Sequence, residues 1–294
     1  MYIYYNSMAT NVANTLTASY NSLATSVERL SSGLRINSAA DDAAGLAIRE
    51  MMRADIAALN QGVRNANDAI SLIQTADGAL GVIDEKLIRM KELAEQAATG
   101  TYDSTQRLMI ESEYQAMASE ITRIANATDF NGLHLLNGNL SGPEHDGSGL
   151  TSTGKLKVHF GTLNDSAEDY YYIDIGTATA SALGVGNQTN STYDAYTVST
   201  QDAAQRALVG LQDAVISKDK IRAHLGALQN RLENTISNLT IQSENLAAAE
   251  SRISDVDVAT EMTNFVRNQI LTQAAVAMLS QANSMPQMAL QLIG

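Results

Sequence analysis

The histidines and paired carboxylates are the residues of this sequence that could perform metal or acid–base chemistry. The histidines are His134, His145, His159 and His224, and none forms the H-E-x-x-H pair that binds zinc on a helix. Glu144-His145-Asp146 could bind a metal weakly, but a solvated loop is the better interpretation of this glycine-rich turn. The absence of cysteine excludes thiol catalysis, disulfides and Cys-based zinc sites together.

Two pairs of aspartates resemble the carboxylate pairs used in general acid–base catalysis. Asp41 and Asp42, like Asp255 and Asp257, stand just before predicted helices, where carboxylates cap free backbone amides. No glycine-rich loop lies between a strand and a helix, so nucleotide binding is not expected. The sequence therefore predicts no catalytic residue, no cofactor and no metal site, and a protein that is not an enzyme.

The overall composition limits the kinds of molecule that the chain can bind. The chain has 294 residues, with 19 Lys and Arg against 32 Asp and Glu, for a net charge of −13. Nucleic-acid and anionic-membrane partners are disfavoured, because both need clustered basic residues. No apolar run reaches about 18 residues, so we expect no membrane span. The usual signals indicate a cytosolic protein, or one exported without a cleaved signal peptide.

The helices must be inferred from apolar spacing, and it is most regular at the two ends. Residues 1–27 and 268–294 contain no Asp, Glu, Lys or Arg. In both ends apolar residues alternate spacings of four and three, a pattern typical of coiled-coil helices that need a partner. We expect the two ends to pack on each other. The larger seam residues are Leu16, Tyr20, Leu23, Val27, Leu30, Leu271, Met278, Met285 and Leu292.

Further helices follow inward from both ends. A second helix is expected to open at a capping box, Ser38 to Asp41, and to stop at Thr99-Gly100. A third has Ile110, Tyr114, Met117, Ile121 and Ile124 as its seam. A fourth is expected from about residue 200 to a break at residues 254–257. Between them, residues 139–199 contain two alternating segments, 155–160 and 169–175, that predict a β-hairpin.

These elements predict a mainly α fold: a long helical hairpin or coiled-coil bundle with a small tip that contains the β-hairpin. Seams rich in alanine bury little area, so the terminal helices should be marginal in an isolated chain. Stability must then come from neighbouring copies. A head-to-tail contact that never closes into a ring produces a helical filament.

Two long motifs carry a family resemblance. Residues 14–48, which include Ser31-Ser32-Gly33-Leu34-Arg35, resemble the N-terminal signature of bacterial flagellin. Residues 249–257 and 281–287 are similar to its C-terminal signature. The likeness covers roughly residues 6–138 and 200–294.

The resemblance implies a fold and a role. Residues 1–38 and 254–294 would form the terminal coiled coil called D0, and the seam residues at the two ends would pack subunits together. Residues 39–138 and 200–253 would form the D1 helical bundle, with residues 139–199 as a solvent-facing tip. The family is exported unfolded by the flagellar type III route and polymerises into the extracellular filament. Expected partners are therefore other copies, an export chaperone, the filament cap and the hook-junction proteins.

A second feature follows from the same resemblance. Residues 87–96 are similar to the flagellin segment that the vertebrate Toll-like receptor for flagellin recognises. Arg89 and Leu93 match its basic and apolar positions, and Glu113 matches the acidic one. The alternative is that Arg89 and Glu113 are solvated or contact another subunit, and the two interpretations are compatible.

Two other functions remain open at this stage. A flagellin-like hook–filament junction protein would share the terminal helices but match the signatures less well. An enzyme with an active tip domain is a more distant third, because the tip offers so little chemistry.

Overall fold

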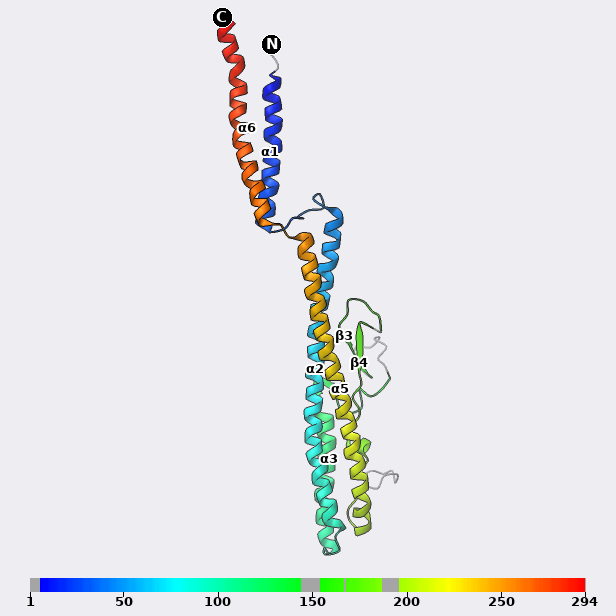
Figure 1. The fold of residues 1–294 in the computed structure, drawn as a ribbon. Coiled ribbons are helices and arrows are strands. Elements are labelled where there is room, and N and C mark those ends of the chain that lie inside the picture. The colour runs from blue at the N-terminus through cyan, green and yellow to red at the C-terminus, as the bar shows by residue number, and fades with distance from the viewer. Residues whose placement is uncertain (1–5, 144–153, 167, 187–195, 294) are drawn as a thin grey trace. The chain divides into compact units, whose positions relative to one another are not determined.

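The structure, a computed structural model, describes residues 6–143, 154–166, 168–186 and 196–293, without the side chains of 286, 287 and 289–293. The Glu144-His145-Asp146 turn lies outside the described residues. The elements are α1 (Ser7–Ser32), α2 (Ala43–Ala98), α3 (Ser104–Ala127), β1 (Asp129–Phe130), β2 (Leu133–His134), β3 (Leu156–His159), β4 (Tyr170–Ile173), α4 (Ala180–Leu183), α5 (Gln201–Ser254) and α6 (Val258–Ile293) (Figure 1). The prediction of a mainly α fold with a β-hairpin is confirmed.

The chain divides into two compact units. The terminal unit contains the residues up to Ile56 and those from Glu244 onward, and the central unit is Ala57–Ser243. Helices α2 and α5 contribute residues to both units. The finer division into D0, D1 and tip segments stays a prediction.

The start of α2 differs in detail from the prediction. Only half of the expected capping box forms: the Asp41 carboxylate accepts the backbone N–H of Ser38, and also that of Asn37. The other half is absent, because the Ser38 hydroxyl donates to the same carboxylate and the Asp41 N–H donates to the Ser38 carbonyl. The hydrogen bonds that this carboxylate accepts, that from the Ser38 N–H foremost, lower the pKa of Asp41 below its ordinary value. The helix is capped four residues after Ser38, where the Asp42 carboxylate accepts the N–H of Gly45 at 2.9 Å. Asp42 is therefore the capping residue.

The predicted helix boundaries elsewhere agree with the structure. Helix α2 ends at Ala98, directly before Thr99-Gly100. Helices α5 and α6 are separated at residues 255–257, where the Asp257 carboxylate accepts the N–H groups of Ala259 and Thr260. The break arises because a carboxylate at this point satisfies amides at the start of α6 that have no partner within the helix.

The core of the central unit is built from heptad positions of α2, α3 and α5. On α3, the predicted seam residues Ile110, Tyr114 and Ile121 are buried, while Met117 and Ile124 pack against the core from its margin. Fully buried aliphatic residues of the other two helices face them, among them Leu80, Ile83, Leu87, Leu93, Leu211 and Leu225. Each such side chain stabilises the unit by roughly 1.5–3 kcal/mol relative to exposure.

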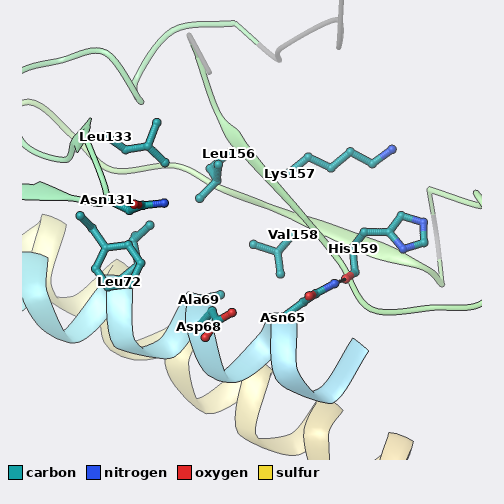
Figure 2. Close-up of a pocket in the computed structure, with 11 residues that line it drawn as sticks. Asn65, Asp68, Ala69, Leu72, Asn131, Leu133, Leu156, Lys157, Val158 and His159 are labelled. Atoms are coloured by element: carbon teal, nitrogen blue, oxygen red, sulfur yellow. Dashed lines mark hydrogen bonds between the residues drawn. The ribbon is translucent and has the colours of Figure 1, made fainter. Parts of the chain in front are cut away.

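The β-hairpin docks on α2. Strands β3 and β4 pair antiparallel, with Val158 opposite Tyr171. Figure 2 shows Val158 directed toward α2 and Lys157 directed away from it. The Asn65 amide of α2 donates to the His159 carbonyl at 2.8 Å. A Cβ at Gly62 would collide with the Phe160 carbonyl, so glycine is required for this close approach.

Two small elements were not predicted. The Asn131-Gly132 turn after α3 belongs to a short hairpin, in which β1 pairs with β2 and Asn131 adopts a φ of 52°. Helix α4 is a single turn capped by Thr179. Both are too short to produce a periodic signal in the sequence.

Candidate functional site

The paired terminal helices are the candidate functional site, since the sequence places its most regular seams there. Helices α1 and α6 lie side by side along the terminal unit (Figure 1). The Asn6 amide donates to the Ala282 carbonyl at 2.9 Å, which ties the start of α1 to α6. The expectation that the two ends pack on each other is therefore met within one chain.

Only part of the predicted apolar stripe of α6 faces α1. Ala275 and Ala282 are buried, and Thr272 is buried in place of its neighbour Leu271. Leu271, Met278 and Met285 stay exposed, Met278 by 58%. The alanines allow α1 to approach closely, and the bulky residues then lie beside the contact. The side chain of Leu292 lies outside the described residues.

The predicted α1 seam divides in a similar way. Leu16, Leu23 and Leu30 are half-buried, whereas Tyr20 and Val27 are exposed. Ser26, a polar residue that the heptad pattern did not select, is the buried residue of this helix. The apolar stripe of α1 is thus wider than the surface that α6 covers.

Helix α6 exposes apolar side chains around much of its circumference. The exposed residues are Val258, Met262, Val266, Ile270, Leu271, Val276, Met278, Met285 and Met288. A helix that is apolar on all sides is normally buried, and a large exposed apolar surface marks an interaction site. The charge-free ends therefore carry a surface that one chain cannot cover.

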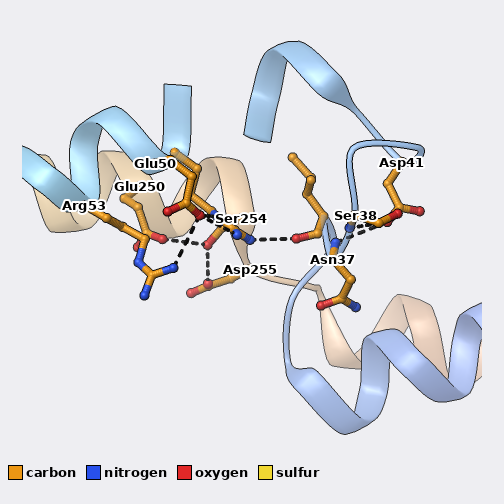
Figure 3. Close-up of polar contacts among 10 residues, drawn as sticks. Asn37, Ser38, Asp41, Glu50, Arg53, Glu250, Ser254 and Asp255 are labelled. Atoms are coloured by element: carbon orange, nitrogen blue, oxygen red, sulfur yellow. Dashed lines mark hydrogen bonds and ion pairs between the residues drawn. The ribbon is translucent and has the colours of Figure 1, made fainter. Parts of the chain in front are cut away.

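The two linkers of the terminal unit are joined to each other by backbone hydrogen bonds. The Arg35 N–H donates to the Ser254 carbonyl at 2.6 Å, and the Val256 N–H donates to the Gly33 carbonyl at 3.0 Å. The fully buried Ser254 hydroxyl lies between the Glu250 and Asp255 carboxylates (Figure 3). These contacts fix the linker after α1 against the linker before α6.

Arg49 holds the same region from the α2 side. This buried guanidinium donates to the Ile36 carbonyl at 2.7 Å and pairs with Glu50 at 2.7 Å. Hydrogen bonding from Arg49 lowers the pKa of Glu50 below its ordinary value. Arg49 was not identified from the sequence.

The three residues matched to the receptor segment lie in the central unit. Arg89 Nη2 of α2 lies 2.8 Å from Glu113 Oε1 of α3, and its Nη1 lies 2.9 Å from Glu92 Oε2. These hydrogen bonds, that with Glu92 foremost, raise the pKa of Arg89 above its ordinary value. Leu93 is only 1% exposed and belongs to the core, so its side chain does not lie on the surface. Leu93 is buried because it falls on the core-facing side of α2.

An open groove of about 340 Å³ lies between α2 and the hairpins of the central unit. Apolar residues such as Leu72, Leu156 and Val158 line it (Figure 2). Its polar residues on α2 are Asn65, which is already bonded to the His159 carbonyl, and Asp68. Within the described residues no three His, Cys, Asp or Glu side chains lie close enough to hold a metal ion. Over the same part of the chain, no helix has the length and apolar character required to cross a membrane.

The comparisons with known proteins agree with this anatomy. Family models match the bacterial flagellin N-terminal helical region over residues 3–141 and its C-terminal helical region over residues 208–293. The chain is 41% identical to the flagellar filament 33 kDa core protein of Treponema phagedenis, with all of both chains covered. It is 42% identical to a flagellin of Bacillus subtilis, again over all of both chains.

Among solved structures, a crystal structure of Bacillus cereus flagellin aligns with a TM-score of 0.47 and 29% identity, covering 64% of this chain and 94% of that one. The two family models match both helical regions, at the two ends where the paired helices and their exposed apolar surface lie. The chain belongs to the bacterial flagellin family.

Proposed function

We propose that this chain polymerises through the exposed apolar faces of α1 and α6 and forms a bacterial flagellar filament. The exposed circumference of α6 is the observation that carries the proposal, because burying it requires neighbouring copies. A flagellin is a structural protein and not an enzyme.

The filament subunit is favoured over the hook–filament junction protein. The relatives that are matched over their full length carry the names flagellin and filament core protein. A junction protein was expected to match the two signatures less well. The uninterrupted similarity at both ends therefore supports the filament role.

We extend this proposal to the export route and to partners other than copies of the chain. The chain would leave the cell unfolded through the flagellar export channel, escorted by a chaperone, and assemble beneath the cap after the hook-junction proteins. A chain without cysteine suits this route, since no disulfide can form before export. The terminal segments 1–38 and 254–294 would lie at the filament centre, and residues 139–199 would face solvent.

Met278→Asp tests whether the exposed α6 face is an assembly surface. The residue is exposed in one chain, so the soluble protein should keep its helix content by circular dichroism. In a polymer the charge would be buried without a partner, so seeded filament growth should be lost. Leu163→Asp is the matched control, because it introduces the same charge at a residue 75% exposed on the proposed solvent-facing segment. Growth of Met278→Asp at the parent rate would contradict the proposal.

Deletion of residues 268–294 gives the larger perturbation. It removes the charge-free part of α6 and should leave a soluble central unit that makes no filaments. Electron microscopy after seeding is the measurement. Normal filaments from the truncated chain would exclude α6 as the assembly element.

A second role, recognition by the innate receptor for flagellin, is proposed for the Arg89–Glu113 pair. The pair lies on the surface and joins α2 to α3, whereas Leu93 is buried in the core. Arg89→Ala should reduce receptor signalling by the soluble chain, whereas Arg123→Ala should not. Arg123 is the control because it is also an exposed arginine paired with a carboxylate. Equal signalling by both variants would contradict this role.

A further inference from the structure

A ladder of charged residues lies between α2 and α5 in the central unit. Asp77, Asp84 and Lys91 are spaced by seven residues along α2, so they share one face of that helix. Each contacts a different residue of α5. The three pairs are Asp77 with Arg222, Asp84 with Lys218 and Lys91 with Gln212.

The geometry of each contact is specific. Arg222 Nε and Nη2 lie 2.7 and 3.1 Å from the two Asp77 oxygens, a bidentate arrangement. Lys218 Nζ lies 2.5 Å from Asp84 Oδ1 and 2.7 Å from Asp219 Oδ1. Lys91 Nζ lies 2.8 Å from Gln212 Oε1.

Lys218 occupies an apolar position of the seam. It is 2% exposed, and its heptad neighbours on α5 are Leu211, Leu225 and Leu232, all buried. Burial opposes the charged form, but the hydrogen bonds with Asp219 and Asp84 outweigh it and raise the pKa of Lys218. The side chain is therefore a buried ammonium ion, and its stability depends on which α2 residue lies opposite it.

The apolar seam by itself does not fix how α5 aligns with α2. On α2 the corresponding buried positions are Ile73, Leu80, Leu87 and Ala94, again spaced by seven. A shift of one heptad, about 10 Å along the helix, places aliphatic residues opposite aliphatic residues once more. Hydrophobic packing distinguishes such registers weakly.

The charged ladder distinguishes them strongly. A shift in one direction places the buried Lys218 opposite Lys91, so two cations meet. A shift in the other direction pairs Lys218 with Asp77 but places Arg222 opposite Ile70 and Asp84 opposite Gln212. Only the observed register gives every cation of the ladder an acidic or amide partner.

We propose that a set of charged residues, called here the register code, selects one alignment of α5 against α2. The code consists of Asp77, Asp84 and Lys91 on α2 and of Arg222 and Lys218 on α5. The code acts within one chain, so it is independent of the proposed polymerisation. Its function is specificity of folding, which buried polar groups provide in coiled coils at a cost in stability.

Engineered disulfides can report the register, because the natural chain has no cysteine. The Ser243 hydroxyl lies 3.4 Å from Asn60 Oδ1, so Asn60→Cys with Ser243→Cys reports the observed register. Asn67 lies one heptad further along the same face of α2, so Asn67→Cys with Ser243→Cys reports the shifted register. Both pairs are equilibrated in a glutathione redox buffer and quantified by peptide mapping.

Lys91→Asp is the decisive variant, since it removes the like-charge clash and offers Lys218 a carboxylate in the shifted register. We expect the 67–243 disulfide to increase several-fold over the control Lys91→Gln, which removes the charge without adding a partner. Lys91 is exposed, so neither change disrupts the core. A 67–243 yield no greater than that of the control would overturn the proposal.

A second variant separates specificity from stability. Lys218→Met combined with Asp84→Leu replaces the buried ion pair with apolar groups, which is often neutral or stabilising. We expect an unchanged or higher Tm together with a larger shifted-register disulfide fraction. The disulfide distribution decides the result: if it stays as in the parent, whatever the Tm, the ion pair does not select the register.

Discussion

Leu80, Ile83 and Leu87 are fully buried in the central unit, whereas Leu271, Met278 and Met285 remain exposed in the terminal unit. The two units use the same heptad spacing, yet one closes a core within the chain and the other does not. The central unit has three long helices and a hairpin to cover its seams. In the terminal unit α1 and α6 pair with each other, and α6 still exposes apolar faces.

The charges follow the same division. Ion pairs and a buried lysine link α2 to α5 in the central unit. The charge-free ends have no such pairs to lose when their surfaces are covered by other copies. A buried, unpaired charge is costly, so uncharged ends suit a surface that becomes interior on assembly. The comparison teaches that periodicity predicts helices, while the number of neighbouring elements decides which apolar residues are buried.

The largest expected effect tests that contrast directly. Leu87→Ala should destabilise the central unit by about 2–5 kcal/mol, because it leaves a cavity in a closed core. Met278→Ala should change the free energy of unfolding of the soluble chain by less than about 0.5 kcal/mol. Urea unfolding followed by circular dichroism measures both. Comparable losses for the two variants would mean that the terminal unit is as closed as the central one.

A smaller effect is expected where the hairpin meets α2. Gly62→Ala places a methyl group against the Phe160 carbonyl and should cost about 1–3 kcal/mol through overpacking. Gly81→Ala on the same helix meets nothing within 4 Å, so it should stabilise the chain by up to about 1 kcal/mol. Thermal unfolding distinguishes the two signs. Equal shifts in Tm would show that the hairpin does not rest on Gly62.

The smallest effect concerns the exposed end of the ion ladder. Hydrogen bonding from Arg222 lowers the pKa of Asp77 below its ordinary value of 3.8. Because its pKa is lowered in the folded state, Asp77 stabilises the fold at pH values above its ordinary pKa. This stabilisation is lost as the pH falls through the folded-state pKa. Both side chains are partly solvated, so Asp77→Asn should cost at most about 1 kcal/mol at neutral pH.

The pH dependence supplies the control for this variant. The difference in unfolding free energy between parent and Asp77→Asn should be constant from about pH 5 to 8 and should shrink below about pH 4. Added salt should reduce it as well. A difference that persists unchanged in acid would assign the effect to packing instead of charge.

The helices and the principal hairpin could be predicted because their signals are local. Four-three alternation identifies α1, α2, α3, α5 and α6, and the aspartates before α2 and α6 mark helix starts by capping chemistry. The period-two alternation at residues 155–160 identifies β3. The cap of α2 was placed incorrectly, since Ser38 and Asp42 are both good capping residues and only the turn around Asp41 decides between them.

The site could be predicted only in part. The sequence located the paired ends, but not that Thr272 would face α1 while Leu271 would remain outside. It selected Arg89 and Glu113, which do meet, together with Leu93, which is buried. Arg49 and Lys218 were missed, because a cation in a helix is normally solvated. The Asp84 partner of Lys218 also lies far away in the sequence.

By itself the sequence determined that the chain is helical, that its ends are uncharged and periodic, and that it matches the flagellin signatures, since each depends on residues close together in the chain. The tertiary structure decided which seam residues are covered, which glycine admits the hairpin and which carboxylate meets the buried Lys218. Those outcomes depend on the alignment of helices far apart in sequence, which a repeating apolar pattern leaves undetermined.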